Sequence, residues 1–356
     1  MDSLSQIVLG AAVAEVCVGK KIGNKALLWG AIAGTIPDLD VLTNFWMDEF
    51  TAMTLHRGFS HSIVFCLLAS PIFAWIWIKL TSVLSGRNYI SKVNFKGWTL
   101  MFFWCFITHI ALDCLTTWGT QIFWPFSPRV STNSIFVADP LYTIPFLILL
   151  IVLMFFKRTN PRRSKIARFS LILSTSYLAI GMLVKIPVNN AFADALEIQG
   201  FEVIDFESRP MPLNIMLWTV NAEIEDGYLL GYYSIFDEDN DIKFRHVPKN
   251  WEIGDEYIED PLFQKVLFMT SGWYALDLQE EYLLVNDLRF GQPEGWNSEP
   301  DEFVFQYKMY EDDQGKLSVL NPEPPRPEKD EVWEILKGLF RRALGNKDPS
   351  TGLASR

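Results

Sequence analysis

Residues 97–118 read GWTLMFFWCFITHIALDCLTTW, an apolar stretch long enough to cross a lipid bilayer as a helix. His109 and Asp113 fall in its second half at positions i and i+4, so their side chains lie on one face of that helix. A charged carboxylate near the centre of a membrane helix costs about 2.5–3.5 kcal/mol even on the milder insertion scales. The stretch therefore predicts a membrane helix in which Asp113 needs a partner.

Five further apolar segments lie in the first half of the chain. They are Leu4–Val18, Ala26–Leu42, Ser62–Leu80, Leu141–Phe156 and Ile166–Ile186. The first is shorter than the roughly 20 residues that cross a bilayer unaided, and Pro37, Asp38 and Asp40 interrupt the second. Charged or irregular backbone at membrane depth must be buried in protein or line a wet cavity. We therefore expect these two segments to form a helical hairpin packed against the others, close to a site.

Charge divides the chain into two halves. Residues 1–186 hold 16 Lys and Arg against 8 Asp and Glu, a net charge of +8, whereas the remainder holds 15 against 34, a net charge of −19. The basic residues of the first half gather in loops around positions 20–25, 79–96 and 157–165, which predicts that these loops are cytoplasmic. Three segments, Met1–Ser5, Pro37–His61 and Trp118–Pro140, and everything after Pro187 are then extracytoplasmic. Because the acidic half repels phosphate backbones, nucleic acid is not expected as a partner.

The second half has the pattern of a β-rich domain. Short alternating runs, such as residues 214–220 and 228–234, are separated by Asp-Gly and Asn/Asp-rich turns. After a Pro-rich linker at 322–327, Glu331–Leu344 places its apolar residues on one helical stripe. The predicted fold is an α-helical polytopic membrane domain, a β-rich extracytoplasmic domain and an amphipathic tail helix. The predicted boundaries are 1–187 for the membrane domain, 188–322 for the acidic domain, and 323–356 for the linker and tail.

Three of the four histidines stand beside carboxylates in segments assigned to one side of the membrane. His56 and His61 flank Arg57 in the sequence HRGFSH, and Asp38 and Asp40 belong to the sequence PDLD. Mixed imidazole and carboxylate ligands suit zinc, manganese or iron better than calcium. We therefore predict a divalent metal site, with zinc as the first choice and two or three ions. Its candidate ligands are His56, His61, His109, Asp113, Asp38, Asp40 and Asp2.

Such a site would hydrolyse a phosphoester or an ester with metal-activated water. Asp38 or Asp40 is the candidate general base, and Arg57 and Arg129 are candidates for holding an anionic substrate. A site that faces the membrane favours a lipid or lipid-linked substrate. Asp2 has a second interpretation as the N-cap of the first helix. The competing function is a transporter or scaffold, in which the same groups form a structural metal site or a buried polar network.

Together these motifs resemble a known bacterial family. Their sequences are DSLSQ at 2–6, GTIPDLD at 34–40, HRGFSHS at 56–62, HIALD at 109–113 and DPLY at 139–142. In this order they resemble the LexA-regulated, inner-membrane-associated, predicted metal-dependent hydrolases, the YdjM-like family, over about residues 1–235. The resemblance implies a multi-pass protein of the inner membrane, and it extends no ligand role to Gln6, where the family has histidine. The HxxxD and PD elements are more distantly similar to zinc-dependent phospholipase C, which implies phosphoester chemistry.

Overall fold

The structure is a computed structural model of the chain. It describes residues 1–47, 51–52, 55–85, 93–126, 128–279, 282–297, 302–320 and 329–347. Two predicted features, the middle of the basic loop (residues 86–92) and the Pro-rich linker at 322–327, lie outside these residues. The chain splits into two compact units, Met1–Leu183 and Val184–Arg356.

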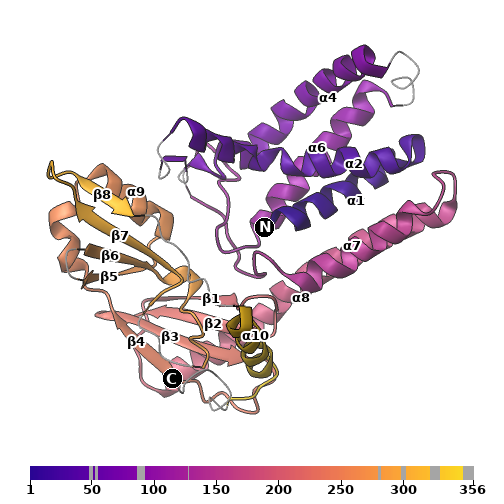
Figure 1. Cartoon of the computed structure of the whole chain (residues 1–356). Helices are drawn as coiled ribbons and strands as arrows, with labels where there is room; N and C mark the ends of the chain where they lie inside the picture. Colours follow the sequence, from indigo (N-terminus) through magenta and orange to yellow (C-terminus); the bar gives the residue numbers. More distant parts are fainter. Residues whose placement is uncertain are drawn as a thin grey trace. The chain divides into compact units, whose positions relative to one another are not determined.

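The first unit is helical. Its elements, in chain order, are α1 (Ser3–Ile22), α2 (Asn24–Thr35), the 3-10 helices η1 (Pro37–Phe45) and η2 (Phe59–His61), α4 (Ile63–Ser85), α6 (Phe95–Asp113), α7 (Pro140–Met154) and most of α8 (Pro161–Ile198) (Figure 1). In the described part of the chain, α1, α4, α6 and α8 are long and apolar enough to cross a membrane. The pair α2 and η1, bent by 51°, forms a fifth candidate. The apolar segments of the sequence are therefore helices, several of them of membrane-spanning length.

Some helix boundaries differ from the expected ones. α1 has 20 residues because Lys20 and Lys21 belong to its last turn instead of ending it, so it is long enough to span. α2 stops at Thr35, and the chain continues through Ile36 into the 3-10 helix η1, whose first residue, Pro37, has no backbone N–H to donate. α7 has only 15 residues, whereas α8 has 38 and continues through Pro187.

α1 and α2 form a hairpin whose backbones touch. A Cβ atom built at Gly30 would lie 2.2 Å from the carbonyl oxygen of Gly10, and one built at Gly34 would lie 2.5 Å from that of Gln6. Because these distances leave no room for a side chain, only glycine permits this approach, as in other small-residue contacts between membrane helices.

Three segments predicted to share one side of the membrane gather at one end of this unit. The backbone N–H of Asp2 donates to Val137 at 2.8 Å, which joins the N-terminus to the segment before α7. The N–H of Gln121 donates to the carbonyl of Arg57 at 3.0 Å, which joins the segment after α6 to the segment before η2. We call this the site end of the unit.

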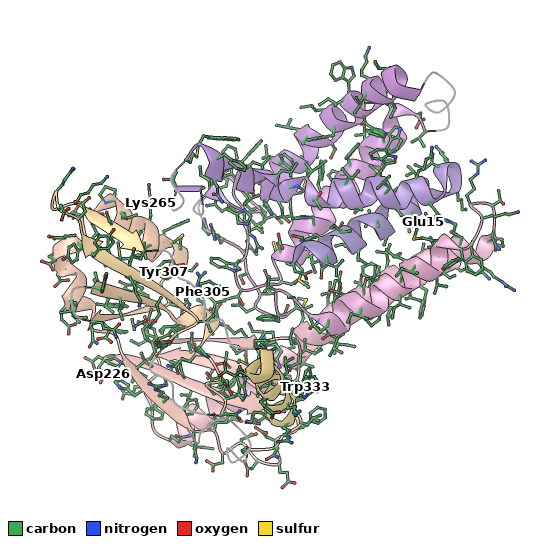
Figure 2. The ribbon with its side chains drawn as sticks, viewed as in Figure 1. Glu15, Asp226, Lys265, Phe305, Tyr307 and Trp333 are labelled. Carbon is green, nitrogen blue, oxygen red and sulfur yellow. The ribbon has the colours of Figure 1, made fainter. Side chains whose placement is uncertain are left out.

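A buried ion pair lies near the opposite end. Arg163 of α8 donates from Nε and Nη2 to the two carboxylate oxygens of Glu15 on α1, at 2.7 and 2.6 Å, and both side chains are almost fully buried (Glu15 is labelled in Figure 2). Arg163 also donates to the side chain of Asn24 at 2.6 Å, where α2 begins. The guanidinium group therefore joins α8 to the α1–α2 hairpin.

The second unit contains two antiparallel sheets, which confirms the β-rich prediction. The first has the order β1-β2-β3-β4, with β1 (Asp205–Pro210), β2 (Leu217–Glu223), β3 (Gly227–Ser234) and β4 (Phe244–Pro248). The second has the order β5-β6-β7-β8, with β5 (Tyr274–Gln279), β6 (Tyr282–Asp287), β7 (Phe305–Glu311) and β8 (Leu317–Leu320). Between the sheets in the chain lie η3 (Trp251–Tyr257) and α9 (Pro261–Thr270), and η4 (Leu288–Phe290) follows β6.

The tail contains α10 (Lys329–Ala343). Leu339 and Ala343 are buried against Leu217 and Met211, whereas Trp333, labelled in Figure 2, is exposed. One side of α10 therefore packs on the first sheet.

Buried polar side chains join the two sheets. Arg209 of β1 and Asn221 of β2 donate to the carbonyl of Leu288 at 3.1 and 2.7 Å. Beside them, Arg289 donates from Nε and Nη2 to the two carboxylate oxygens of Asp287, at 3.0 and 2.6 Å. Because both members of this pair are buried, each charge depends on the other.

Candidate metal centre

Four of the predicted ligands meet at the site end of the first unit. Asp38, His61, His109 and Asp113 each offer one ligand atom, and these atoms all lie within 4.8 Å of one another. The Nε2 atom of His61 is 3.3 Å from that of His109 and 3.2 Å from Oδ1 of Asp38. Nε2 of His109 is 3.4 Å from the same Asp38 oxygen. Oδ2 of Asp113 is 3.4 Å from both Nε2 atoms.

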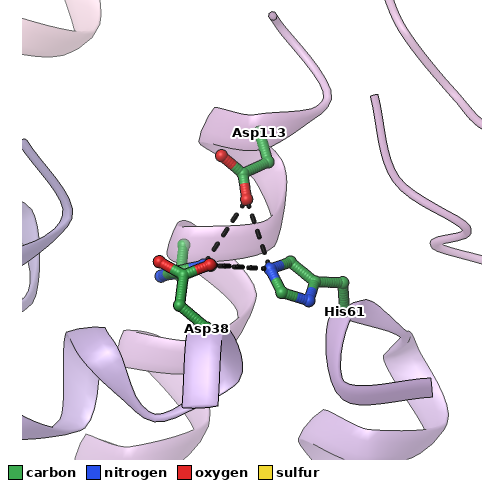
Figure 3. A group of neighbouring side chains, drawn as sticks. Asp38, His61 and Asp113 are labelled. Atoms are coloured by element: carbon green, nitrogen blue, oxygen red, sulfur yellow. Dashed lines mark hydrogen bonds and ion pairs between the residues drawn. The ribbon is translucent and has the colours of Figure 1, made fainter. Parts of the chain in front are cut away.

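Three elements bring these residues together. Asp113 is the last residue of α6, with His109 one turn before it; Asp38 is the second residue of η1, and His61 the last of η2. Figure 3 shows Asp38, His61 and Asp113 pointing toward one another from these elements. We call the four residues the ligand group.

The spacing of the ligand group fits a small divalent cation. Nitrogen and oxygen ligands about 2.0–2.2 Å from a tetrahedral zinc ion lie about 3.3–3.6 Å apart. The separations of 3.2–3.4 Å match this range closely. In addition, Oδ2 of Asp113 is buried without a hydrogen-bond partner. A buried charged oxygen in this state is costly, and a cation would satisfy it.

Hydrogen bonds on the far side of each imidazole direct Nε2 toward the ligand group. Nδ1 of His109 lies 2.6 Å from the carbonyl oxygen of Gly34, which can only accept, so Nδ1 carries the proton and Nε2 of the neutral ring has the lone pair. Nδ1 of His61 lies 3.3 Å from Oδ2 of Asp40 and 3.0 Å from Oγ of Ser60. Such acceptors orient metal-binding imidazoles and raise their basicity. Sequence reasoning missed Gly34 and Ser60, although both stand within the quoted motifs.

Asp40 and His56 lie beside the ligand group. Oδ1 of Asp40 is 2.7 Å from Nδ1 of His56. Oδ2 accepts from Oγ of Ser60 at 2.5 Å and from the backbone N–H of Arg57 at 3.1 Å. Both carboxylate oxygens are therefore engaged in supporting neighbours, whereas the ring of His56 is 37% exposed.

The second oxygen of Asp113 is surrounded by donors. Oδ1 accepts from the amino group of Met1 and from Nε2 of Gln6 at 3.2 Å, and the guanidinium of Arg57 is 3.7 Å away. These contacts turn Oδ2 toward the ligand group. Gln6, to which the sequence assigned no ligand role, thus contacts a candidate ligand.

Two other carboxylates from the quoted motifs cap helices. Asp2 is the N-cap of α1 and accepts from the backbone N–H of Ser5 at 3.1 Å. Asp139 is the N-cap of α7 and also accepts from the hydroxyl of Tyr177 at 2.7 Å. Asp2 is not part of the ligand group, and its contacts in the structure are those of a helix N-cap.

The ligand group attracts positive charge. Burial alone would lower the pKa of His61, which precedes α4, but the carboxylates of Asp113, Asp38 and Asp40, 3.2–3.4 Å from its ring nitrogens, raise its pKa to about 10. Without a cation, the carboxylates therefore hold a proton on the imidazole, and a metal ion would replace that proton.

Two comparisons with known proteins bear on the family to which the chain belongs. A family model described as YdjM inner membrane protein matches residues 1–187. The inner membrane protein YbcI of Escherichia coli (strain K12) is 29% identical over 127 residues, which cover 34% of this chain and 68% of YbcI. No solved structure matches. Neither match bears on LexA regulation or on similarity to phospholipase C, which stay hypotheses. Because the family model covers more than half of the chain, the protein belongs to the YdjM inner membrane protein family.

Proposed function

We propose that this protein is a metal-dependent hydrolase of the bacterial inner membrane, acting on a phosphoester or ester of a lipid or lipid-linked substrate. The observation that carries the proposal is the ligand group, in which five separations between ligand atoms are 3.2–3.4 Å, close to those around a four-coordinate ion. A bound divalent cation would lower the pKa of a coordinated water and stabilise charge that develops on a phosphoryl or carbonyl oxygen.

Side chains around the ligand group have separate roles in this proposal. Asp38, His61, His109 and Asp113 hold the ion. Asp40 was a candidate for general base, but both of its oxygens already accept hydrogen bonds. We therefore assign it to positioning, and we assign proton transfer to the more exposed His56 that it orients.

The ligand group determines how many ions we propose, and its ligand count bears on which metal would bind. In the described residues, one group of this kind is present, so we propose one ion in place of the two or three expected from the sequence. Four protein ligands complete a tetrahedral zinc site, which is typical of structural zinc. A six-coordinate manganese or iron ion would leave two positions for water and substrate. The ligand count therefore also supports a second candidate function, a membrane scaffold with a structural metal.

The site end is proposed to face the extracytoplasmic side, together with the acidic β-rich domain, with 1–187, 188–322 and 323–356 as the domain boundaries. The support is the bias of basic residues toward the other end. A membrane-impermeant maleimide tests this orientation in intact spheroplasts of a chain in which Cys17 is replaced by Ala. Asn44→Cys should be labelled and Lys25→Cys should not, and the reverse pattern would overturn the orientation.

The function is tested with the purified chain. Elemental analysis should find about one transition metal per chain, and a phospholipid panel should be hydrolysed only when metal is bound. His109→Ala should lose the metal and the hydrolysis together, whereas the matched control His246→Ala, an exposed histidine of β4, should retain both. Absence of metal, with unchanged stability in a chelator, would exclude the hydrolase. A tightly held metal without hydrolysis would favour the scaffold.

A further inference from the structure

A cavity of about 230 Å³ lies next to the ligand group. Its polar lining includes Asn44, His56, Arg57 and Arg129, and its apolar lining includes Val41 and Trp118. Among its described lining residues there is no carboxylate. Two guanidinium groups around a small space are typical of a site for phosphate or carboxylate, which they bind with paired hydrogen bonds.

Arg57 lines the cavity and also contacts the metal centre. Its guanidinium is 3.7 Å from Oδ1 of Asp113, and its backbone N–H donates to Asp40. Arg129 donates to the carbonyl of His56 at 3.2 Å, so this guanidinium lies beside the histidine that Asp40 orients. An anion bound in the cavity would therefore be adjacent to the ligand group.

Large apolar side chains are exposed around this end of the unit. Val41 lines the cavity and is 50% exposed, and η1 continues to Phe45, which is 82% exposed, followed by Trp46, which is 70% exposed. In the segment after α6, Phe123 and Phe126 are 59% and 71% exposed. We call Phe45, Trp46, Phe123 and Phe126 the aromatic collar.

The collar residues follow two candidate membrane spans along the chain. Phe45 is the last residue of η1, which ends the bent α2–η1 candidate, and Phe123 and Phe126 follow α6, which ends at Asp113. Aromatic residues at the ends of membrane helices lie at the boundary between lipid and water. Exposed aromatic residues in such positions are typical of the level at which acyl chains meet headgroups.

We infer that the cavity binds the phosphate-bearing headgroup of a membrane lipid, whose acyl chains leave past Val41 along the collar. The cavity has room for a headgroup and not for a whole lipid, its guanidinium groups match a phosphodiester, and Val41 in its lining is an exposed apolar residue of η1. This inference rests on the proposed function for the fate of the lipid, but binding itself requires no metal.

The test measures binding of fluorescent phosphatidylglycerol by polarisation. It uses the full chain in neutral detergent micelles with a chelator present, so hydrolysis does not contribute. Arg129→Gln removes one charged donor and should weaken binding by about tenfold or more. Its matched control is Arg158→Gln, because Arg158 also donates to a backbone carbonyl, that of Lys21, but at the opposite end of the unit. The control should bind like the unaltered chain.

A second pair of variants tests the collar. Phe45→Ser and Phe155→Ser each remove an aromatic side chain that is 82% exposed, one at the site end and one after α7. Only Phe45→Ser should weaken binding. This pair keeps the inference testable if Arg129→Gln lowers folding yield.

Competition separates the possible sources of the phosphate. Unlabelled phosphatidylglycerol should displace the probe, whereas diacylglycerol, which has no phosphate, and glycerophosphoglycerol, which has no acyl chains, should be weaker by at least about tenfold. Equal displacement by diacylglycerol, or equal binding by Arg129→Gln and Arg158→Gln, would overturn the headgroup site. Equal displacement by glycerophosphoglycerol would replace the lipid with a water-soluble phosphoester. Binding in chelator without hydrolysis in metal would retain the inference and reject the hydrolase.

Discussion

Asp40→Asn should weaken metal binding even though Asp40 is not in the ligand group. The substitution removes the charged acceptor behind Nδ1 of His61, 3.3 Å away, and leaves all four ligand atoms in place. Loss of such a partner costs about 10–100-fold in metal affinity, or about 1.4–2.7 kcal/mol. We expect the variant to bind the ion within this range of weakening.

Thermal unfolding in metal-buffered detergent solution measures the effect. At a free metal concentration of about 1,000 times the dissociation constant, the ion stabilises the unaltered chain by about 4.1 kcal/mol. At the same concentration, Asp40→Asn should gain only about 1.4–2.7 kcal/mol, because the concentration is then about 10–100 times its own dissociation constant. Comparing each variant with and without chelator separates this gain from the loss of the other hydrogen bonds of Asp40.

The chain supplies a matched control for this substitution. Asp226, labelled in Figure 2, lies 3.5 Å from His246 in the second unit, and both side chains are well exposed. Asp226→Asn should leave the metal-dependent gain unchanged. If Asp40→Asn gained as much from metal as the unaltered chain, or if Asp226→Asn lost as much, the supporting role of Asp40 would be refuted.

Three further substitutions test the surrounding structure. Gly34→Ala places a Cβ 2.5 Å from a backbone oxygen of α1, so it should cost about 1–3 kcal/mol and weaken metal affinity; unchanged thermal unfolding and metal titration would contradict this. Arg163→Ala should destabilise the chain by about 3–5 kcal/mol by leaving Glu15 unpaired, and Glu15→Gln combined with Arg163→Met should recover much of the loss. Asp287→Ala should lower the free energy of unfolding by a similar amount, because it removes the carboxylate that pairs with the buried Arg289, and it should not change the metal stoichiometry. Loss of metal in this variant would argue against a site confined to the first unit.

The sequence predicts which residues belong to the site better than it predicts what each of them does there. His109 and Asp113 are recognisable because a spacing of four residues on an apolar helix places them on one face. Asp38 and Asp40 are not distinguishable in this way, since their roles depend on the local helix type. On a 3-10 helix, with three residues per turn, two residues are separated by about 240° of rotation. Asp38 therefore faces the ligand group while Asp40 turns toward His56.

Other roles depended on contacts between distant segments. Arg57 was predicted to hold substrate from its charge alone, but its position beside Asp113 follows from the pairing of the segment before η2 with the end of α6. The lysines at the end of α1 indicated a boundary, yet the helix continues through them because Lys side chains are favourable in the last turn. Local sequence contains the charge of these residues, and the fold decides which group each charge contacts.

Exposure within the ligand group bears on the choice between hydrolase and scaffold. The side chains of His61, His109 and Asp113 are at most 1% exposed, whereas that of Asp38 is 27% exposed. An ion held here would be enclosed on three sides and approachable beside Asp38. A structural ion gains nothing from an accessible ligand, because entry of water only weakens the electrostatic attraction that holds it. A catalytic ion requires access, since water and substrate must reach it. The uneven burial of the ligand group therefore favours the hydrolase over the scaffold.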